Sequence, residues 1–206
     1  MLIVFSISLQ AQTDKKAQDI LKSVSVKYKS LKNITAKFKL NIKDQANKAI
    51  QNQNGTLVLK GVKYKLVMGT QEILSDGKMV WTYLKDANEV QINEPKSDPG
   101  AITPQNIFTI YEKGFKSKYI GEKTVGGKVL QIIELVPEDA KRNFIKIQLT
   151  INKSEKYIAQ AIVYEKSGTN YTYSIDSFNS NTEVNDTIFT FNKSNYPNVD
   201  VIDLRN

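Results

Sequence analysis

The side chains that could do chemistry in this sequence are carboxylates, lysines and tyrosines, because it contains no cysteine and no histidine. Thiol chemistry, disulfides, zinc sites built from Cys and His, and Ser-His-Asp triads are therefore excluded. The acidic residues in predicted loops, Asp86, Glu138 and Asp139, form no pair with catalytic spacing, and Asp76-Gly77 has the composition of a tight turn. The sequence has no phosphate-binding loop, dinucleotide fingerprint or EF-hand. We expect no enzyme, no metal site and no cofactor.

The composition is that of one basic globular domain. The chain has 206 residues, of which 40% are hydrophobic, and its formal net charge is +8. Charge alone is compatible with nucleic-acid binding, but no motif of interleaved basic and aromatic residues supports it. Lys37, Lys39 and Lys43 lie on one side of a predicted strand. Such a row is usually a solvated face, and it also suits transient contact with an anionic membrane surface or an acidic partner.

The N-terminus resembles an export signal. Residues 1–9 read MLIVFSISL, an uncharged apolar run that is too short to span a bilayer. Gln10-Ala11-Gln12 follows as a small-residue cleavage point. We expect residues 1–11 to be a signal peptide and residues 12–206 to form a single exported domain. The alternative is that the run is a buried N-terminal strand.

Elements that could position a site follow from the hydrophobic periodicity. Thr13 is a plausible N-cap for an amphipathic helix, because apolar residues then recur at spacings of three and four up to Leu31. The period changes to two over residues 34–42, which predicts a strand with one apolar and one solvated face. Polar residues 45–54 read as a connection. Short strands then follow at residues 56–60, 62–68, 72–75, 78–84 and 89–93, with turns between them.

A short apolar helix interrupts this antiparallel meander. Prolines cluster between residues 94 and 104, and Thr103-Pro104 reads as an N-cap followed by proline at the first helical position. Gly114 closes the helix as a C-cap. Strands resume at residues 115–122, 128–136, 143–152, 158–165 and 170–178, and a last short strand is predicted near residues 188–191.

These elements predict a mainly β (α+β) fold. A twisted open sheet of about eleven strands tends to curl, so we expect an open, incomplete antiparallel β-barrel with a helical lid. The helices are few for so much sheet, so an apolar cavity is expected beneath them. Such concavities are the usual sites for hydrophobic ligands.

Four segments carry a resemblance to a known family. Residues 75–83 read Ser-Asp-Gly-Lys-Met-Val-Trp-Thr-Tyr, and residues 55–60 form a glycine-led strand. An apolar helix stands at residues 103–111, and the tail at 196–203 has a proline followed by Val-Asp-Val. In order and spacing these segments resemble the bacterial outer-membrane lipoprotein carrier family, known as LolA. The resemblance runs from about residue 17 to the end of the chain.

The resemblance implies a periplasmic carrier that shields the acyl chains of lipoproteins and moves them from the inner to the outer membrane. Members receive their cargo from an inner-membrane ABC-type lipoprotein-releasing complex, and in some bacteria they deliver it to an outer-membrane acceptor. Such a chaperone for acyl chains would act as a monomer without nucleic acid. One feature departs from the family pattern. An arginine often follows the lysine of the glycine-led strand and is implicated in lid closure, whereas here Gly61 follows Lys60, so Lys60 or Lys63 substitutes for it or the lid is held differently.

Periodicity and resemblance together give the expected site. Eight side chains are predicted to line the cavity: Phe38, Leu40, Leu57, Leu59, Tyr64, Leu66, Trp81 and Tyr83. Six are predicted to belong to the lid: Ile20, Leu21, Val24, Ile107, Phe108 and Tyr111. Each could also be an ordinary core residue, and a register slip of one would exchange the two faces. The functional alternatives are a binder or sensor of another lipid on the same fold and, least favoured, a metal-dependent hydrolase.

Overall fold

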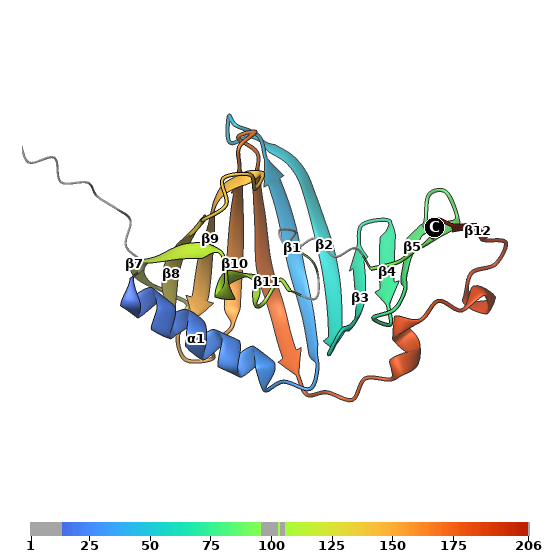
Figure 1. Ribbon diagram of the computed structural model, residues 1–206, viewed down its shortest axis with the longest axis horizontal. Coiled ribbons are helices and arrows are strands. Elements are labelled where there is room, and N and C mark those ends of the chain that lie inside the picture. The colour runs from blue at the N-terminus through green and yellow to red at the C-terminus, as the bar shows by residue number, and fades with distance from the viewer. Residues whose placement is uncertain (1–13, 96–102, 104–105, 206) are drawn as a thin grey trace, which may run out of the picture.

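The computed structural model describes residues 14–95, 103 and 106–205. A single twelve-stranded sheet makes up most of this part of the chain, in the order β12-β6-β5-β4-β3-β2-β1-β11-β10-β9-β8-β7 (Figure 1). The strands are β1 (Ile34–Lys43), β2 (Ala49–Lys60), β3 (Lys63–Met68), β4 (Gln71–Ser75), β5 (Val80–Leu84), β6 (Glu89–Asn93), β7 (Phe115–Val125), β8 (Lys128–Pro137), β9 (Phe144–Asn152), β10 (Ile158–Glu165), β11 (Asn170–Ser180) and β12 (Asp200–Asp203).

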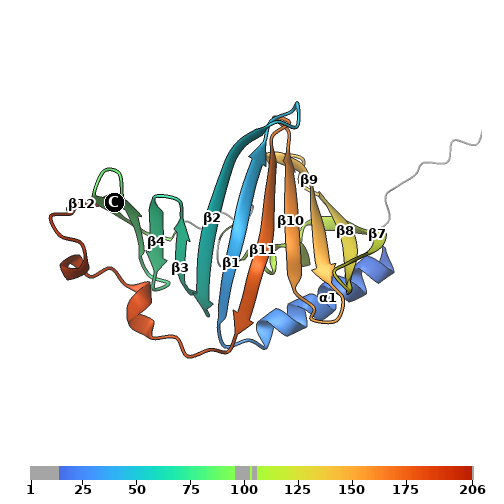
Figure 2. The same ribbon diagram turned by 180° about the vertical axis from the view of Figure 1, so that it is seen from behind.

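The sheet is curved but not closed. Neighbouring strands pair antiparallel except β12, which pairs parallel with β6. The two outermost strands, β12 and β7, lie at opposite ends of the strand order, and Figure 2 shows them far apart. The expected open antiparallel β-barrel with a helical lid is confirmed, with twelve strands where about eleven were expected.

Helix α1 (Lys15–Lys29) forms most of the lid and lies across the half of the sheet that contains β7 to β11. The Asp14 carboxylate caps it by accepting from the N–H of Lys16 at 2.8 Å. The same carboxylate accepts from the N–H of Tyr119, and the N–H of Asp14 donates to the carbonyl of Ser117 at 2.9 Å. The helix start is therefore fastened to β7. Thr13, the expected cap, lies outside the described residues.

The second lid segment is not the regular helix that was expected. Residues 106–109 form turns, and a 3₁₀ helix, η1 (Ile110–Glu112), follows them. Asn106 accepts from the N–H of Thr103 through its side chain and from the N–H of Ile110 through its carbonyl. These bonds fold the segment tightly, and the burial of Phe108 and Tyr111 holds it on the core. Pro104 lies outside the described residues.

Two further expectations about elements are corrected. The polar stretch before Gly55 is part of β2, which forms a long hairpin with β1; exposed polar pairs such as Asn41 and Asn52 bond across it. No hydrophobic alternation marks such a strand, because neither face is buried. Residues 186–189 form a 3₁₀ helix, η2 (Asp186–Phe189), instead of a strand, because Phe189 is fully buried as an anchor. After η3 (Lys193–Asn195), the chain ends in β12.

Hydrophobic residues gather in two clusters. The main cluster joins α1 and the 106–112 segment to β1–β3 and β8–β10. The second is smaller and contains Leu74, Trp81, Val90 and Val199. Ile73 packs on the main cluster whereas the next residue, Leu74, belongs to the second. Because successive strand residues point to opposite faces, the second cluster lies on the other face of the sheet. Among the described residues, no helix is long and apolar enough to cross a membrane.

Candidate functional site

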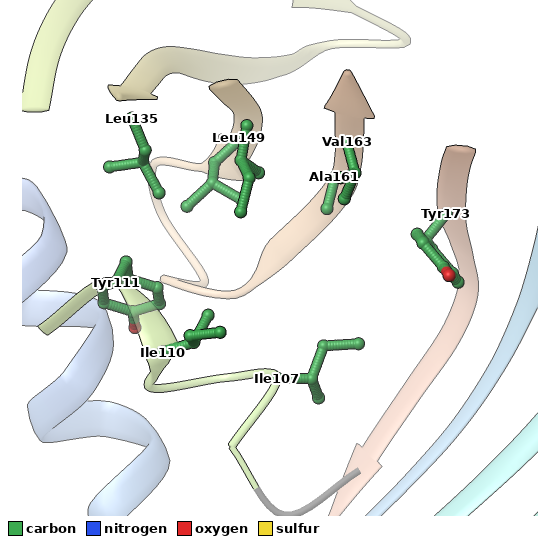
Figure 3. A pocket seen from close by; sticks show the side chains of 9 residues that line it. Ile107, Ile110, Tyr111, Leu135, Leu149, Ala161, Val163 and Tyr173 are labelled. Atoms are coloured by element: carbon green, nitrogen blue, oxygen red, sulfur yellow. The ribbon is translucent and has the colours of Figure 1, made fainter. Parts of the chain in front are cut away.

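An apolar pocket lies between the second lid segment and the sheet (Figure 3). Its free space is about 30 Å³, which is room for about one or two water molecules. Apart from two tyrosines, the lining is wholly aliphatic: Ile107, Ile110, Tyr111, Leu135, Ile147, Leu149, Ala161, Val163 and Tyr173. The second lid segment therefore packs closely on β8–β11 and leaves little free space beneath it.

A second hollow opens beside the C-terminal end of α1. It measures about 220 Å³. It lies between the C-terminal end of α1, the start of β1, the β2–β3 turn and residues 108–109. Ile34, Leu59 and Phe108 form its apolar side, whereas Lys29 and Lys32 are its basic residues. The hollow is therefore amphipathic, with apolar wall and charged rim side by side.

Three contacts hold the two lid pieces together. The rings of Tyr28 and Phe108 stack with their centroids 4.5 Å apart. The Ser25 hydroxyl donates to the Tyr111 hydroxyl at 3.4 Å, and the Lys29 ammonium pairs with the Glu112 carboxylate at 2.7 Å. The bond from Lys29 lowers the pKa of Glu112, while burial raises the pKa of Tyr111 to about 12. The lid is thus one apolar surface built from two segments that lie far apart in sequence.

Tyr28 also fastens the lid to the sheet. Its hydroxyl accepts a hydrogen bond from the N–H of Ile158 at 3.0 Å, at the start of β10. Its ring meets Phe178 of β11 edge to face, and Phe178 stacks on Tyr157. Burial raises the pKa of Tyr28 well above its ordinary value, which keeps the hydroxyl neutral.

The structure brings most of the expected site residues together. The main cluster contains Phe38, Leu40, Leu57, Leu59 and Tyr64 as buried residues, with Leu66 packed against it. It also contains all six expected lid residues, with Ile20 and Ile107 partly buried and Leu21, Val24, Phe108 and Tyr111 buried. Of these twelve, however, only Ile107 and Tyr111 line the closed pocket.

The pocket wall comes from β8–β11, which the sequence analysis did not select. Its residues are Leu135, Ile147, Leu149, Ala161, Val163 and Tyr173. The alternation of apolar residues in these strands is visible in the sequence, so the inward face could have been found. The missing information was which strands lie under the second lid segment, and only the tertiary structure provides it.

Trp81 and Tyr83 do not face the main cluster, and their expected position is corrected. Trp81 is buried in the second cluster opposite Leu74, and Tyr83 packs against it there. The ring of Tyr83 meets Tyr196 edge to face at 4.7 Å. The C-terminal segment covers this face of β4–β6, so both faces of β5 are partly buried and the strand's large side chains turn away from the lid.

In the part of the chain that the structure describes, Lys60 and Lys63 bind the C-terminal segment and make no contact with the lid. Both ammonium groups bind the Asp186 carboxylate, at 2.5 and 2.7 Å, and Lys60 also donates to the carbonyl of Val184. These bonds lower the pKa of Asp186 to about 2. Gly61 lies in the turn between the two lysines with φ of 59°, a conformation that favours glycine. The contacts of Asp14, Ser25, Tyr28 and Lys29 hold the lid.

Acidic groups do not converge near the pocket. Within the ranges that the structure describes, no three acidic side chains cluster where they could hold a metal ion. The arrangement that remains is an apolar surface beneath a cover formed by α1 and the 106–112 segment. Apolar concavities, including those in the mouths of β-barrels, are common sites for small hydrophobic ligands.

Comparison with known proteins identifies the family. The model of the family described as "Outer membrane lipoprotein carrier protein LolA" matches residues 29–192, which is most of the chain. The chain belongs to this family. Its members are binding and carrier proteins that are periplasmic or exported. No curated protein matches the chain.

Solved structures share the fold at low sequence identity. An uncharacterized conserved protein from Thermus thermophilus aligns with a TM-score of 0.61 and 11% identity, covering 92% of this chain and 99% of its own. A DUF1329 family protein from Desulfovibrio piger aligns with a TM-score of 0.52 and 12% identity, covering 90% and 99%. LprF from Mycobacterium bovis aligns with a TM-score of 0.50 and 13% identity, covering 84% and 97%.

Proposed function

We propose that this protein is a periplasmic carrier that shields the acyl chains of lipoproteins under its lid and transfers them from the inner to the outer membrane. The observation that carries the proposal is the apolar pocket between the second lid segment and β8–β11. Membership of the lipoprotein carrier family supports the same ligand class. In this role the protein binds and releases its cargo and catalyses no reaction.

The energetics of acyl binding explain why the closed pocket is small. Burying one methylene is worth about 0.8 kcal/mol, so a chain with roughly a dozen buried methylenes gains on the order of 10 kcal/mol. Two or three fully buried chains would exceed the ceiling of roughly 18–21 kcal/mol for non-covalent binding. A cavity that is filled by its own lid when empty offsets part of this gain, because lid contacts must break before acyl chains enter. Binding then stays weak enough for transfer.

The proposed site is the whole surface that lid opening uncovers. On the sheet it contains the pocket-lining residues of β8–β11 together with Phe38, Leu40, Leu57, Leu59, Tyr64 and Leu66. On the lid it contains Ile20, Leu21, Val24, Ile107, Phe108 and Tyr111. The sheet is held by continuous pairing, so the lid is the part that moves.

The remaining parts of the proposal concern the setting. Residues 1–11 act as a signal peptide, and the domain of residues 12–206 works in the periplasm as a monomer. It receives acylated lipoproteins from an inner-membrane ABC-type releasing complex and delivers them to the outer membrane or to an acceptor there. Contact with the membrane surface is transient.

A transfer assay tests this function. Inner-membrane spheroplasts with an active releasing complex should release lipoproteins when the protein is added, and the released lipoproteins should copurify with it. Release that does not depend on the protein would contradict the proposal.

A pair of variants on β10 ties the assay to the pocket. Ala161→Phe fills the pocket and should lower the amount of copurified lipoprotein several-fold. Ile162→Phe is the matched control, because residue 162 is the next residue of the same strand and points to the opposite face. Equal loading of A161F and wild type would show that acyl chains bind elsewhere.

A further inference from the structure

Arg142 stands at the rim of the main cluster, in the loop that joins β8 and β9. Its guanidinium carbon lies 4.6 Å from the ring centroid of Phe115 and 5.7 Å from that of Phe144. These two rings stack on each other with centroids 6.1 Å apart. Gly114 makes room for the guanidinium, because a Cβ there would lie 3.2 Å from Nη2. Gly114 follows the lid closely in sequence, so Arg142 packs where the lid ends.

The guanidinium of Arg142 has unmet hydrogen-bonding capacity. Nη1 is buried and has no hydrogen-bond partner among the described residues. None of the ion pairs between described residues includes Arg142, although Glu138 and Asp139 belong to the same loop. Asp139 uses its carboxylate to accept from the backbone N–H of Lys141. A buried cationic donor without an acceptor is costly, and the two ring faces compensate it only in part.

The other arginine of the chain provides a contrast. The sequence has 29 basic residues, and only Arg142 and Arg205 are arginines. Arg205 forms a bidentate ion pair with Asp203: Nε donates to Oδ1 at 2.8 Å, and Nη2 donates to Oδ2. Arginine suits such paired bonds to carboxylate or phosphate better than lysine does. Arg142 has the same guanidinium geometry, but no acidic side chain among the described residues pairs with it.

We propose that Arg142 binds the anionic group of an acyl ligand, a carboxylate or phosphate that adjoins the acyl chain. The inference rests on the proposed acyl-binding function and adds the headgroup class. Phe144 belongs to the same cluster as the pocket residues Leu135 and Ile147. Arg142 is partly exposed above Phe144. A ligand whose chain enters the apolar interior can therefore leave its charged end at the rim, beside Arg142.

Binding of three alkyl probes of equal length tests the headgroup preference. Dissociation constants of dodecanoate, dodecyl phosphate and dodecanol are measured for the wild-type protein. Charge-assisted hydrogen bonds predict that the two anions bind about tenfold or more tightly than the alcohol. Equal binding of all three would overturn the headgroup inference while leaving acyl binding intact. Binding of none would overturn the proposed function itself.

Matched arginine variants locate the preference. R142Q should bind all three probes about equally, with the affinity for dodecanol unchanged. R205Q removes the other arginine and should keep the wild-type preference. R142K keeps the charge but loses the fork, so an intermediate preference is expected. A preference that persists in a folded R142Q protein, as judged by circular dichroism, would overturn the assignment. The comparison of the three probes on the wild-type protein tests the headgroup preference even if no variant folds.

A last set of ligands distinguishes the source of the anion. Inorganic phosphate alone should not displace dodecanoate at millimolar concentration; displacement would overturn the requirement for an acyl chain. An acylated peptide with glutamate beside its acyl group represents lipoprotein cargo, and short-chain phosphatidylglycerol represents a phospholipid. An affinity loss in R142Q for either one assigns the anion to that source. A loss for neither would contradict the role of Arg142.

Discussion

At the scale of single residues, Tyr28 combines three contacts in one side chain. Its ring stacks on Phe108 of the other lid segment and meets Phe178 of the sheet edge to face, and its hydroxyl accepts from the N–H of Ile158. The polar bond is buried, so neither partner can exchange it for water. Tyr28 therefore fixes where the lid closes on the sheet as well as how tightly.

Tyr28→Phe should destabilise the protein through this bond alone. The ring is kept, but the buried N–H of Ile158 loses its acceptor, which costs about 1–3 kcal/mol of unfolding free energy. Urea denaturation measures the change. Tyr171→Phe is the control, because the Tyr171 hydroxyl makes no hydrogen bond to a described residue, and its effect should stay within about 0.5 kcal/mol. Equal stability of Y28F and wild type would mean that water replaces the hydroxyl.

Asp186 makes the stability of the C-terminal segment depend on acid. Hydrogen bonds from Lys60 and Lys63 lower its pKa from 3.8 to about 2 in the folded protein. Because the pKa of Asp186 is lower in the folded than in the unfolded protein, its carboxylate stabilises the fold at any pH above the unfolded pKa of 3.8. This stabilisation is lost as the pH falls through the folded pKa of about 2. Asp186→Asn should therefore melt below wild type at pH 7, and the difference should shrink between pH 4 and pH 2. A pH-independent difference would show that the carboxylate charge is not the cause.

At the scale of elements, the lid depends on a contact between segments that are separated by more than eighty residues. The Lys29–Glu112 ion pair closes the outer edge of the seam between α1 and η1, while Tyr28 and Phe108 close the inner edge. Lys29 is well exposed, so the pair itself is worth little in overall stability. Its effect is expected in the opening rate of the lid.

Reversing the charge of Lys29 should loosen the seam. Lys29→Glu places two carboxylates together, and exposed pairs of this kind are worth about 0.2–1 kcal/mol, so ligand dissociation should be up to about fivefold faster. The double variant K29E/E112K restores opposite charges and should return the rate to that of wild type. Stopped-flow release of a fluorescent fatty acid measures both. The pair has no role at the seam if K29E releases the ligand at the wild-type rate.

At the scale of the whole molecule, the two hydrophobic clusters stabilise different parts of the fold. The main cluster contains the pocket and the lid, whereas the second anchors the C-terminal segment and β12 on the other face of β4–β6. The pairing of β12 with β6 also covers the edge that β6 would otherwise expose. We therefore expect that changes in the second cluster alter stability without altering the proposed ligand-binding surface.

Trp81→Phe tests this division. The change removes volume from the second cluster and should lower the free energy of unfolding by about 1–3 kcal/mol. Loading with lipoprotein or dodecanoate should match that of wild type, because Trp81 does not face the pocket. Thermal melting and the loading assay are measured on the same sample. Reduced loading at an unchanged melting temperature would show that Trp81 contributes to ligand binding after all.

Hydrophobic alternation made most strands predictable, because a strand with one buried face has a clear period of two. It failed where burial did not follow that pattern. The first half of β2 has no buried face, and β12 is exposed along its length. Residues 188 and 189 read as strand, but Phe189 serves as an anchor in a 3₁₀ helix.

The sequence by itself determined the class of fold, the two-part lid and the lack of thiol and histidine chemistry. It also indicated which residues alternate on each strand. Only the tertiary structure decided which face of each strand packs against α1, the 106–112 segment or the C-terminal segment. Trp81 and Tyr83 turn away from the lid because the C-terminal segment buries that face of β5, and β8–β11 form the pocket wall because the 106–112 segment folds back onto them. Local sequence cannot encode such choices, since contacts between distant segments determine them.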